Sequence, residues 1–411
     1  MGKETTIVII DPRWHGLAYI DAARTRGYRV VVIVPYKDHP IKHGYVGKYR
    51  DLIVNDLEDI DSVIKSLETS KYRGSIDAVV PGNCYFTPMV NKIAAHFGLR
   101  GESYEAALRS RLKDLGRMAY DSAGILNTKY AIIHNLDEAL GAAEKIGYPI
   151  VLKPTDGGGS EHVTLVKDST ELTTAMKALL AYEKTSFNFK MRQVFLIEEF
   201  ITGQEFSVEL FIIDKQIKFG SVTEKISSPL PYFVEIGHIV PTSVYIDKTA
   251  EIIETAFKAV LALGFSNGPF HVELRLSPKG TIIMETNGRV AGGLIASDLI
   301  INAFGVNIFD SFIQYLLDRP FDMTPTKKEA SCIANLTANK DGKVIAIEGV
   351  EELGQYKNIV KCNLKVKVGD NVRLARDGAD RLGYVISVAK TPAEAKKSAF
   401  DAANSIKLTV S

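Results

Sequence analysis

The sequence contains little cysteine and no dominant charge. Its 411 residues include only three cysteines, Cys84, Cys332 and Cys362, in no spacing that suits structural zinc or a disulfide framework. Reduced thiols predict a cytoplasmic protein. Fifty basic and 49 acidic residues leave a formal net charge of +1. Because no overall field attracts nucleic acid or an anionic membrane, we expect neither as a partner.

A long hydrophobic run at the start and a dinucleotide-binding motif are also missing. The first apolar run, residues 6–10, ends at Asp11 and is too short for a signal peptide or a membrane span. The turn after it lacks the Gly-x-Gly-x-x-Gly of a Rossmann dehydrogenase. Trp14 and His15 in this turn could face a ligand or pack inside the fold, and both interpretations stay open.

The first hundred residues alternate short β-branched runs with amphipathic stretches. Strands are predicted at residues 6–10, 30–34, 52–54 and 78–80. Helices are predicted at residues 16–26, 60–67 and 88–97. Strand and helix in repeated alternation predict a parallel α/β sheet.

From about residue 112 the pattern becomes mixed α+β. Helices are predicted at residues 112–122, 136–146, 249–263 and 392–405, with Thr391 as the cap of the last. Strands are predicted at residues 130–133 and 149–153 and within 194–213 and 220–240. Residues 194–213 are expected to form hairpin-like strands, and hairpin turns are expected at 339–342 and near 369–371.

A glycine-rich loop follows the predicted strand that ends at Lys153. The loop contains Gly157, Gly158, Gly159 and Ser160. Glycines allow backbone N–H groups to crowd around phosphate oxygens, and the lysine supplies a cation for the same group. The pattern favours phosphate binding, with a mobile hairpin tip as the alternative.

Two alternating runs joined by residues 278–280 predict a further hairpin. In the simplest register Ser277 faces Thr281, which sets Glu273 opposite Glu285 and places Asn287 beside them. Alternation also puts His271 and Arg275 on the face of Glu273. Like charges in this position repel unless a cation lies between them, and oxygen ligands favour magnesium. A solvated polar face is the alternative.

Arg289, Gly292 and Gly293 stand at the start of a predicted helix. Backbone amides and the helix dipole stabilise anions there, and a guanidinium can clamp a phosphoryl group or a carboxylate. A simple ion pair between Arg289 and Glu285 is the alternative.

In this order the motifs resemble the ATP-grasp superfamily of carboxylate-amine ligases, and the match extends over nearly the whole chain. The resemblance implies an ATP-grasp fold with four parts. These are a pre-ATP-grasp α/β domain at 1–112, a lid and small lobe at 113–198, a large lobe at 199–325 and a C-terminal subdomain at 326–411. It further implies ATP as the nucleotide, two Mg²⁺ ions that Mn²⁺ can replace, and a homodimer.

The resemblance also assigns roles to single residues. Lys113, Lys153 and the loop of Gly157, Gly158, Gly159 and Ser160 would bind phosphates; Glu198 and the backbones of Glu199 and Ile201 would bind adenine; Glu205 would bind ribose. Glu273, Glu285 and Asn287 would be the magnesium ligands. Arg289, with the amides of Gly292 and Gly293, would stabilise a tetrahedral oxyanion.

Within that superfamily the residues Asn-Gly-Arg-Val-Ala-Gly-Gly at 287–293 are most similar to the L-amino-acid ligases, which join amino acids into dipeptides through an acyl phosphate. Residues 233–238 resemble the substrate loop of that group, with Glu235 and His238 near the acceptor amine; otherwise they are ordinary surface residues. Two alternatives stay open. One is an ATP-grasp enzyme acting on bicarbonate or another carboxylate, and the other is a non-catalytic ATP-binding module.

Overall fold

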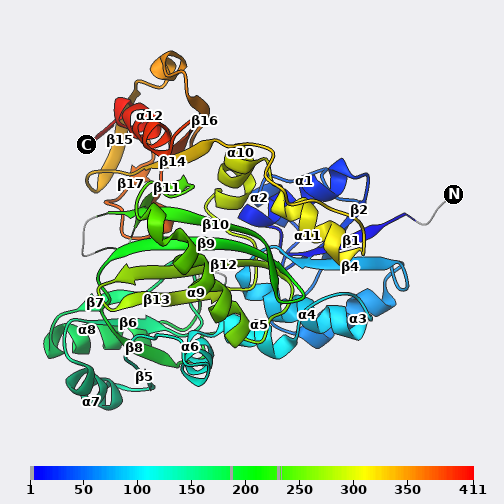
Figure 1. Cartoon of the computed structure of the whole chain (residues 1–411), viewed down its shortest axis with the longest axis horizontal. Coiled ribbons are helices and arrows are strands. Elements are labelled where there is room, and N and C mark those ends of the chain that lie inside the picture. The colour runs from blue at the N-terminus through cyan, green and yellow to red at the C-terminus, as the bar shows by residue number, and fades with distance from the viewer. Residues whose placement is uncertain (1–3, 186–187, 229–231, 233) are drawn as a thin grey trace.

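The structure is a computed structural model that describes residues 4–185, 188–228, 232 and 234–411. Four sheets and the helices that cover them form the described part of the chain (Figure 1). Phe233, at the start of the expected substrate loop, and the side chain of Trp14 lie outside the described part.

The N-terminal sheet is parallel, as the alternation of strands and helices predicts. Its strands lie in the order β3 (Asp51–Val54), β2 (Arg29–Val34), β1 (Thr6–Ile10) and β4 (Ile76–Pro81). Helices α1 (Leu17–Thr25) and α11 (Ile308–Leu316) cover one face, and α3 (Ile60–Thr69) and α4 (Thr87–His96) cover the other. The short α2 (His39–Lys42) follows β2. Every residue of β1 is buried because both faces are covered.

The small lobe follows two linking helices, α5 (Tyr104–Arg111) and α6 (Lys113–Ser122). Its antiparallel strands lie in the order β5 (Tyr130–Ile133), β8 (Phe195–Glu199), β6 (Ile150–Pro154) and β7 (Thr164–Val166). Helices α7 (Leu136–Ile146) and α8 (Ser169–Leu180) bury their apolar sides against this sheet. The predicted elements at 130–133, 136–146 and 149–153 are confirmed to within one residue.

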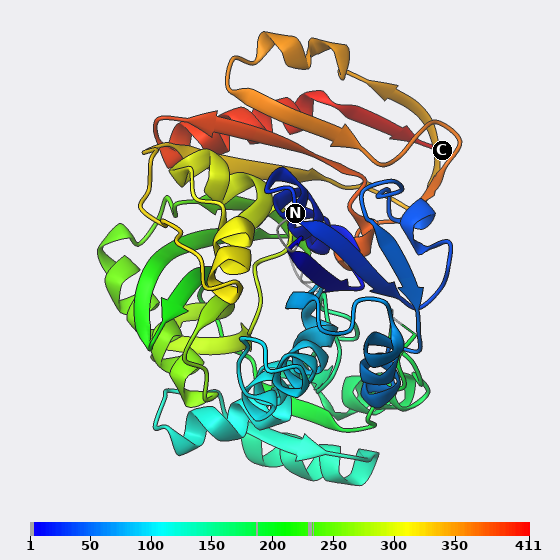
Figure 2. The same cartoon turned by 90° about the vertical axis from the view of Figure 1, so that its right-hand side faces the viewer.

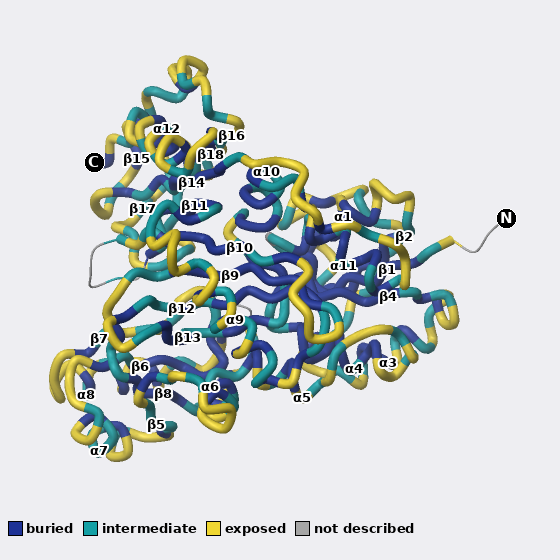
Figure 3. The backbone as a smooth tube through the Cα atoms, in the orientation of Figure 1, coloured by how far each residue is buried: buried dark blue, intermediate teal, exposed yellow. Residues whose placement is uncertain are grey.

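An eight-stranded antiparallel sheet forms the centre of the molecule. Its order is β13 (Gly280–Asn287), β12 (Gly268–Ser277), β9 (Gln204–Ile213), β10 (Gln216–Ser227), β11 (Glu235–Val240), β14 (Ala330–Leu336), β18 (Gly383–Ala389) and β16 (Ile359–Leu364). Helix α9 (Thr249–Ala262) covers the half formed by β9, β10, β12 and β13, and α12 (Pro392–Ser405) covers β14 and β18. Figure 3 shows the central strands as mostly buried and the outer loops as exposed.

The C-terminal elements extend this central sheet and add a small one. The small sheet has the order β17 (Asn371–Val372), β15 (Gly342–Glu348) and β19 (Lys407–Val410). Figure 2 shows these elements at one end of the molecule and the small lobe at the other. Thr391 caps α12 as predicted, and Glu394 completes a capping box.

The three expected hairpins outside residues 268–287 are wrong. Strand β8 pairs with β5 and β6, whereas β9 pairs with β10 and β12. Gly203 lies between these two strands, and a Cβ there would lie 2.1 Å from the carbonyl oxygen of Leu276 on β12. Strand β14 pairs with β11 and β18, and β15 pairs with β17 and β19, so the turns at 339–342 and 369–371 connect different sheets. Turn residues predict where the chain turns, but the pairing of the flanking strands depends on strands that are distant in sequence.

The helix expected after the two glycines begins later and in a different form. Gly293 and Leu294 both adopt left-handed backbone angles, with φ of 60° and 63°. A π-helical turn (Ile295–Leu299) then leads into α10 (Ile300–Phe304). The glycine pair therefore lies in a tight turn that precedes the helix.

Within the described ranges no single helix is long and apolar enough to cross a membrane. The bent pair of segments 295–304 and 308–316 would be long and apolar enough only if the two were counted together.

Candidate active site

The β12–β13 hairpin sets Glu273 opposite Glu285, but by a register that differs from the predicted one. Ser277 pairs with Gly280 and not with Thr281, so the turn has two residues instead of three. A β-bulge next to Glu273 then adds one residue to β13 and brings the two carboxylates opposite each other again. The predicted pair is present, and the predicted turn is wrong.

The oxygen atoms near this pair fit the expected magnesium ions. The Glu273 and Glu285 side chains are 25% and 26% exposed. Asn287 ends β13 and is buried opposite His271. Two carboxylates and an amide oxygen are ligands that magnesium prefers in proteins.

Lys113 connects this hairpin to the glycine-rich loop. Its Nζ donates to the carbonyl oxygen of Gly157 at 2.9 Å and lies 3.4 Å from Glu285 Oε1. The loop, residues 157–160, follows β6, and Gly159 and Ser160 have φ of 66° and 63°. Arg111 donates to the carbonyl oxygens at the start of the same loop. Two cations thus lie against the loop that is expected to bind phosphate.

In the small lobe Glu198 lies between two cations. Lys153 Nζ is 2.7 Å from Glu198 Oε2, and Arg117 Nε is 2.8 Å from Oε1. Arg117 also donates to the carbonyl oxygen of Ile283 on β13 at 2.6 Å, so it joins the two lobes. Burial alone would raise the pKa of Glu198, but Arg117 and Lys153 lower it to about 2. Burial lowers the pKa of Lys153, and the charge of Arg117 adds to this effect. Sequence reasoning missed Arg117.

The segment expected to bind adenine and ribose already has hydrogen bonds and ion pairs within the protein. The Glu199 N–H donates to the Lys129 carbonyl oxygen at 2.8 Å, and its carboxylate pairs with Lys279. Arg275 donates to the Ile201 carbonyl oxygen at 3.0 Å and to Glu205 Oε2 at 2.7 Å. These contacts fix the crossing from β8 to β9.

Lys225 on β10 is the largest omission of the sequence reasoning. Its Nζ lies 2.7 Å from Glu205 Oε1, 2.6 Å from Glu235 Oε1 and 2.9 Å from Glu273 Oε2. The side chain is only 2% exposed. Burial alone would lower the pKa of Lys225, but the three carboxylates raise it well above its ordinary value. A lone lysine in a strand gives no local signal that three distant glutamates surround it.

His271 holds Glu273 from the other side. Its Nδ1 lies 3.0 Å from Glu209 Oε2, and its Nε2 lies 3.2 Å from Glu273 Oε1. Burial would lower the pKa of His271, but Glu209 and Glu273 raise it to about 9. The alternation of β12 had placed His271 on the face of Glu273, so the signal was present in the sequence.

Glu235 and His238 lie together on β11. His238 Nε2 is 3.3 Å from Glu235 Oε2, and Arg381 Nη2 of the C-terminal part lies 2.9 Å from the same oxygen. His238 is 1% exposed, and its Nδ1 has no hydrogen-bond partner among the described residues. These two residues are therefore not ordinary surface residues. Sequence reasoning missed Arg381, which lies 146 residues from its partner.

Two imidazoles flank the glycine pair after Arg289. A Cβ at Gly292 would lie 3.4 Å from His15 Nδ1, and one at Gly293 would lie 3.3 Å from His238 Cε1. Burial, together with the charges of Arg289 and His271, lowers the pKa of His15 to about 3. The first loop of the chain therefore reaches the site.

Arg289 does not form the ion pair that the sequence left open. Its Nη1 donates to the Val290 carbonyl oxygen at 3.0 Å, and its Nε is buried without a partner in the described part of the chain. Glu285 pairs with Lys113 instead. The guanidinium is thus uncommitted to any described carboxylate.

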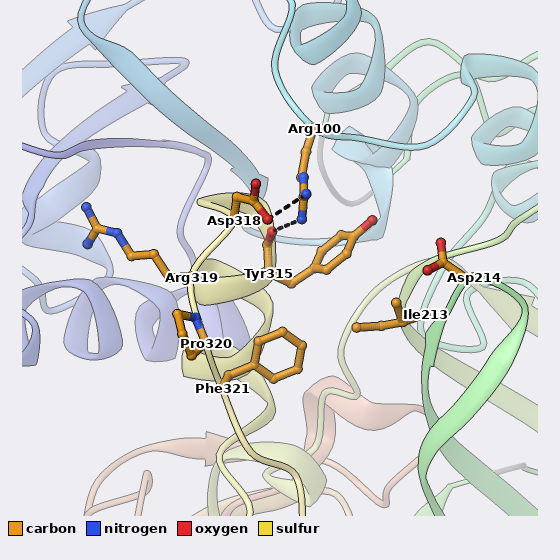
Figure 4. Close-up of a pocket in the computed structure, with 8 residues that line it drawn as sticks. All are labelled: Arg100, Ile213, Asp214, Tyr315, Asp318, Arg319, Pro320 and Phe321. Carbon is orange, nitrogen blue, oxygen red and sulfur yellow. Dashed lines mark hydrogen bonds and ion pairs between the residues drawn. The ribbon is translucent and has the colours of Figure 1, made fainter.

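A separate cavity of about 540 Å³ lies between the end of α11 and the β9–β10 turn (Figure 4). Its lining residues are Arg100, Ile213, Asp214, Tyr315, Asp318, Arg319, Pro320 and Phe321. Arg100 closes one wall through Asp318, at 2.7 Å. None of these residues belongs to the groups described above, so the cavity is not the candidate active site.

Two protein families match parts of this chain. Residues 146–298 match the ATP-grasp domain, and residues 334–411 match the L-amino acid ligase C-terminal domain 2. The first match contains Lys153, the loop after it and the hairpin of Glu273 and Glu285. The second contains Arg381, which contacts Glu235.

Individual proteins agree with these matches. Alanine–anticapsin ligase of Bacillus subtilis is 29% identical over 337 residues, which cover 77% of this chain and 69% of the relative. The L-amino acid ligase of Bacillus licheniformis has a similar structure, with a TM-score of 0.83 over both whole chains at 20% identity. The biotin carboxylase domain of the Hydrogenobacter thermophilus 2-oxoglutarate carboxylase, crystallised as a dimer with MgADP, ADP and bicarbonate, has a TM-score of 0.69 at 15% identity and covers 98% of this chain and 90% of its own.

Proposed function

We propose that the chain, which matches the ATP-grasp domain and the L-amino acid ligase C-terminal domain 2, is a carboxylate-amine ligase that joins two L-amino acids into a dipeptide, releasing ADP and phosphate. The observation that carries the proposal is the position of Lys113. Its ammonium contacts both the glycine-rich loop and Glu285 of the hairpin. A nucleotide phosphate and a metal ion are needed side by side in this chemistry, and Lys113 lies where the two predicted sites meet.

We assign the nucleotide to the residues around Lys113. The loop of residues 157–160, Lys113 and Lys153 would hold the phosphates, Glu198 and the crossing at Glu199 and Ile201 would face adenine, and Glu205 would accept hydrogen bonds from the ribose hydroxyls. Glu273, Glu285 and Asn287 would hold magnesium, two ions in our proposal, for which manganese can substitute. Bound magnesium supplies neutralisation of the charge that develops on the transferred phosphate.

The reaction would proceed in two substitutions. A carboxylate oxygen of the first amino acid bonds to the γ-phosphorus of ATP, and the bond from that phosphorus to the bridging oxygen breaks. ADP is the leaving group, and the acyl phosphate remains bound. The amine of the second amino acid then bonds to the acyl carbon, and phosphate leaves. Arg289 and the amides of Gly292 and Gly293 would stabilise the tetrahedral oxyanion between these steps.

The acceptor amine must lose a proton before it attacks. Glu235 would hold the ammonium group, and the free Nδ1 of His238 supports a role for His238 in accepting the proton. The closeness of His238 to Gly293 supports the same location, because attack occurs beside the oxyanion. Closure of the loop at residues 157–160 would keep water from the acyl phosphate.

We also propose that the enzyme is a cytoplasmic homodimer. The free state of all three cysteines supports a reducing compartment. The mass of the native protein in solution would test the dimer. A single 45.2 kDa species at assay concentration would contradict it.

The function is tested by measuring ADP and phosphate release from MgATP across a matrix of paired L-amino acids, with mass spectrometry of the products. We expect equal release of ADP and phosphate that requires amino acids and yields a dipeptide mass. Bicarbonate and D-alanine serve as controls. Release with bicarbonate alone would indicate a carboxylase, and ATP binding without turnover on any acid would indicate a binding module.

A further inference from the structure

Lys225 is surrounded by three carboxylates from three different strands. Glu205 lies on β9, Glu235 on β11 and Glu273 on β12, and their oxygens are 2.7, 2.6 and 2.9 Å from Lys225 Nζ. A lysine ammonium has three N–H donors and no acceptor. Three carboxylates thus surround these three donors; the contact with Glu273 is a hydrogen bond, and those with Glu205 and Glu235 are ion pairs.

Each of the three carboxylates also has a cation of its own. The second oxygen of Glu205 accepts from Arg275 at 2.7 Å, that of Glu235 from Arg381 at 2.9 Å, and that of Glu273 lies 3.2 Å from His271 Nε2. Both oxygens of every carboxylate are thus held, one by the shared lysine and one by a separate partner. This arrangement fixes the direction in which each carboxylate points.

Without the ammonium this cluster would attract a metal ion. One oxygen from each of Glu205, Glu235 and Glu273 lies within 4.8 Å of the others. Oxygen ligands at this spacing are typical of a divalent cation, and a higher ligand charge raises affinity. Only one of the three, Glu273, belongs to the expected magnesium ligands.

We propose that Lys225 is a positioning residue that acts as a tethered cation: it takes the place of a divalent ion among Glu205, Glu235 and Glu273. It thereby keeps Glu205 and Glu235 out of metal coordination and fixes the direction of both carboxylates, whose remaining lone pairs can accept from organic substrates. Magnesium is left with Glu273, Glu285 and Asn287. The substrates named for Glu205 and Glu235 rest on the proposed function; the exclusion of metal does not.

The test measures Mn²⁺ binding to the nucleotide-free protein by electron paramagnetic resonance. Lys225→Met should gain a Mn²⁺ site at least about tenfold tighter than any in the wild-type protein, because three carboxylates lose their shared cation. Lys218→Met is the matched control, since Lys218 is an exposed lysine on the same strand. We expect no gain there. Lys225→Arg keeps the positive charge and should also gain no site.

The gained site should depend on Glu235. Adding Glu235→Gln to Lys225→Met should remove most of the gain, and because Glu235 is not an expected magnesium ligand, this dependence separates the new site from that of Glu273 and Glu285. A folded Lys225→Met protein with wild-type Mn²⁺ binding would overturn the proposal, as would a gain that survives Glu235→Gln.

A measurement on otherwise wild-type protein covers the case in which Lys225→Met does not fold. Glu205→Gln should leave Mn²⁺ binding unchanged, since Lys225 already occupies the cluster. Loss of a Mn²⁺ site in Glu205→Gln would mean that metal already binds there, and the proposal would be wrong. None of these measurements requires turnover. A negative dipeptide assay would therefore contradict only the proposed function, and a negative Mn²⁺ result would contradict only the role of Lys225.

Discussion

The two lobes hold buried charge in opposite ways. In the small lobe one carboxylate, Glu198, lies between the two cations Lys153 and Arg117. In the large lobe one cation, Lys225, lies among three carboxylates. Counted from these residues alone, the first group has a net charge of one positive and the second of two negative. In the second group Arg275, Arg381 and His271 supply one further cation to each carboxylate. The small lobe thus keeps a surplus positive charge, and the large lobe has carboxylates that cations hold in place.

This difference gives the site a direction. Surplus positive charge in the small lobe suits the phosphates of a nucleotide, and the carboxylates of the large lobe suit metal ions and an ammonium group. Lys113 lies between the two, against the glycine-rich loop and Glu285. We expect the nucleotide phosphates and the metal ions to lie next to each other at Lys113. The adenine would then lie toward Glu198 and the acceptor amine toward Glu235.

The largest effect is expected when the negative side loses a metal ligand. Glu285→Gln keeps the shape of the side chain and removes the charge, so turnover should fall about 10³-fold, equal to about 4 kcal/mol of transition-state stabilisation. Steady-state ADP release measures this. The thermal unfolding temperature should not fall, because Glu285 is a quarter exposed.

Glu254→Gln is the matched control for this change. Glu254 forms an exposed pair with Lys258 on the solvent side of α9. Its substitution should leave turnover within about twofold of wild type, because an exposed ion pair contributes little energy. Near-normal activity of Glu285→Gln would contradict the metal assignment.

On the positive side, Arg117→Met should cause the largest loss of stability. Arg117 and Glu198 are 2% and 5% exposed, so the substitution leaves a buried carboxylate with Lys153 alone and two carbonyl oxygens of β13 without a donor. Breaking a buried pair in this way costs about 3 to 5 kcal/mol. Urea unfolding measures the loss.

Arg26→Met provides the comparison for Arg117→Met. Arg26 pairs with Asp310 at the surface and is 49% exposed. The loss there should be at most about 1 kcal/mol. If both substitutions cost the same, the pair at Glu198 contributes no more than a surface ion pair, and the contrast between the lobes fails.

The pH dependence of stability should report the same carboxylate. The folded-state pKa of Glu198 is about 2, below its ordinary value of 4.5. A depressed pKa stabilises the folded protein above the unfolded-state value, and this stabilisation is lost as the pH falls from about 4.5 to about 2. By linkage the loss is on the order of 3 kcal/mol.

Unfolding curves of wild type and Glu198→Gln between pH 6 and pH 2 isolate this contribution. Other acidic groups act equally in both proteins, so the difference between the two curves belongs to Glu198. We expect the wild-type protein to lose more stability than the variant across this window. Parallel curves would show that Glu198 is not held as a charged group.

The sequence predicted the parts of this comparison that local spacing controls. Glu273 and Glu285 follow from alternation on either side of a turn, and Thr391 from its position before a helix. The bulge beside Glu273 was not foreseen, because two registers of the turn are equally compatible with the sequence. It replaced a three-residue loop with a two-residue turn and left the carboxylate pair unchanged.

The missed residues are those whose partners are distant in sequence. Arg117 is 81 residues from Glu198, and Lys225 is 48 residues from Glu273. Their contacts depend on the order of strands in two sheets, and no spacing rule gives that order. His271 shows the intermediate case, since its face was predicted and its second partner, Glu209 on β9, was not.

Lys153→Met should have a smaller effect on turnover, through the nucleotide, and should also lower stability because Glu198 then keeps only Arg117. A hydrogen bond from a charged donor contributes about 2 kcal/mol, so kcat/KM for ATP should fall about 30-fold. The rate at saturating ATP should change less, because the phosphates bind before the chemical step. Lys145→Met, on the exposed side of α7, is the matched control and should leave both constants unchanged. An unchanged dependence on ATP in Lys153→Met would exclude Lys153 from the phosphate site.

The smallest effect is expected from a change that touches neither charged group. Thr391→Ala removes the cap of α12, where Thr391 Oγ1 accepts from the Glu394 N–H. Loss of such a cap costs about 1 kcal/mol, measured as a lower urea midpoint. Thr174→Ala is the same substitution at an exposed position within α8 and should cost nothing, because alanine favours a helix interior. Since α12 packs on β14 and β18 and not on the hairpin, kcat/KM should stay at the wild-type value in both. A fall in kcat/KM with Thr391→Ala alone would mean that the C-terminal elements act on the site, and Arg381, which reaches Glu235, would be the route to examine.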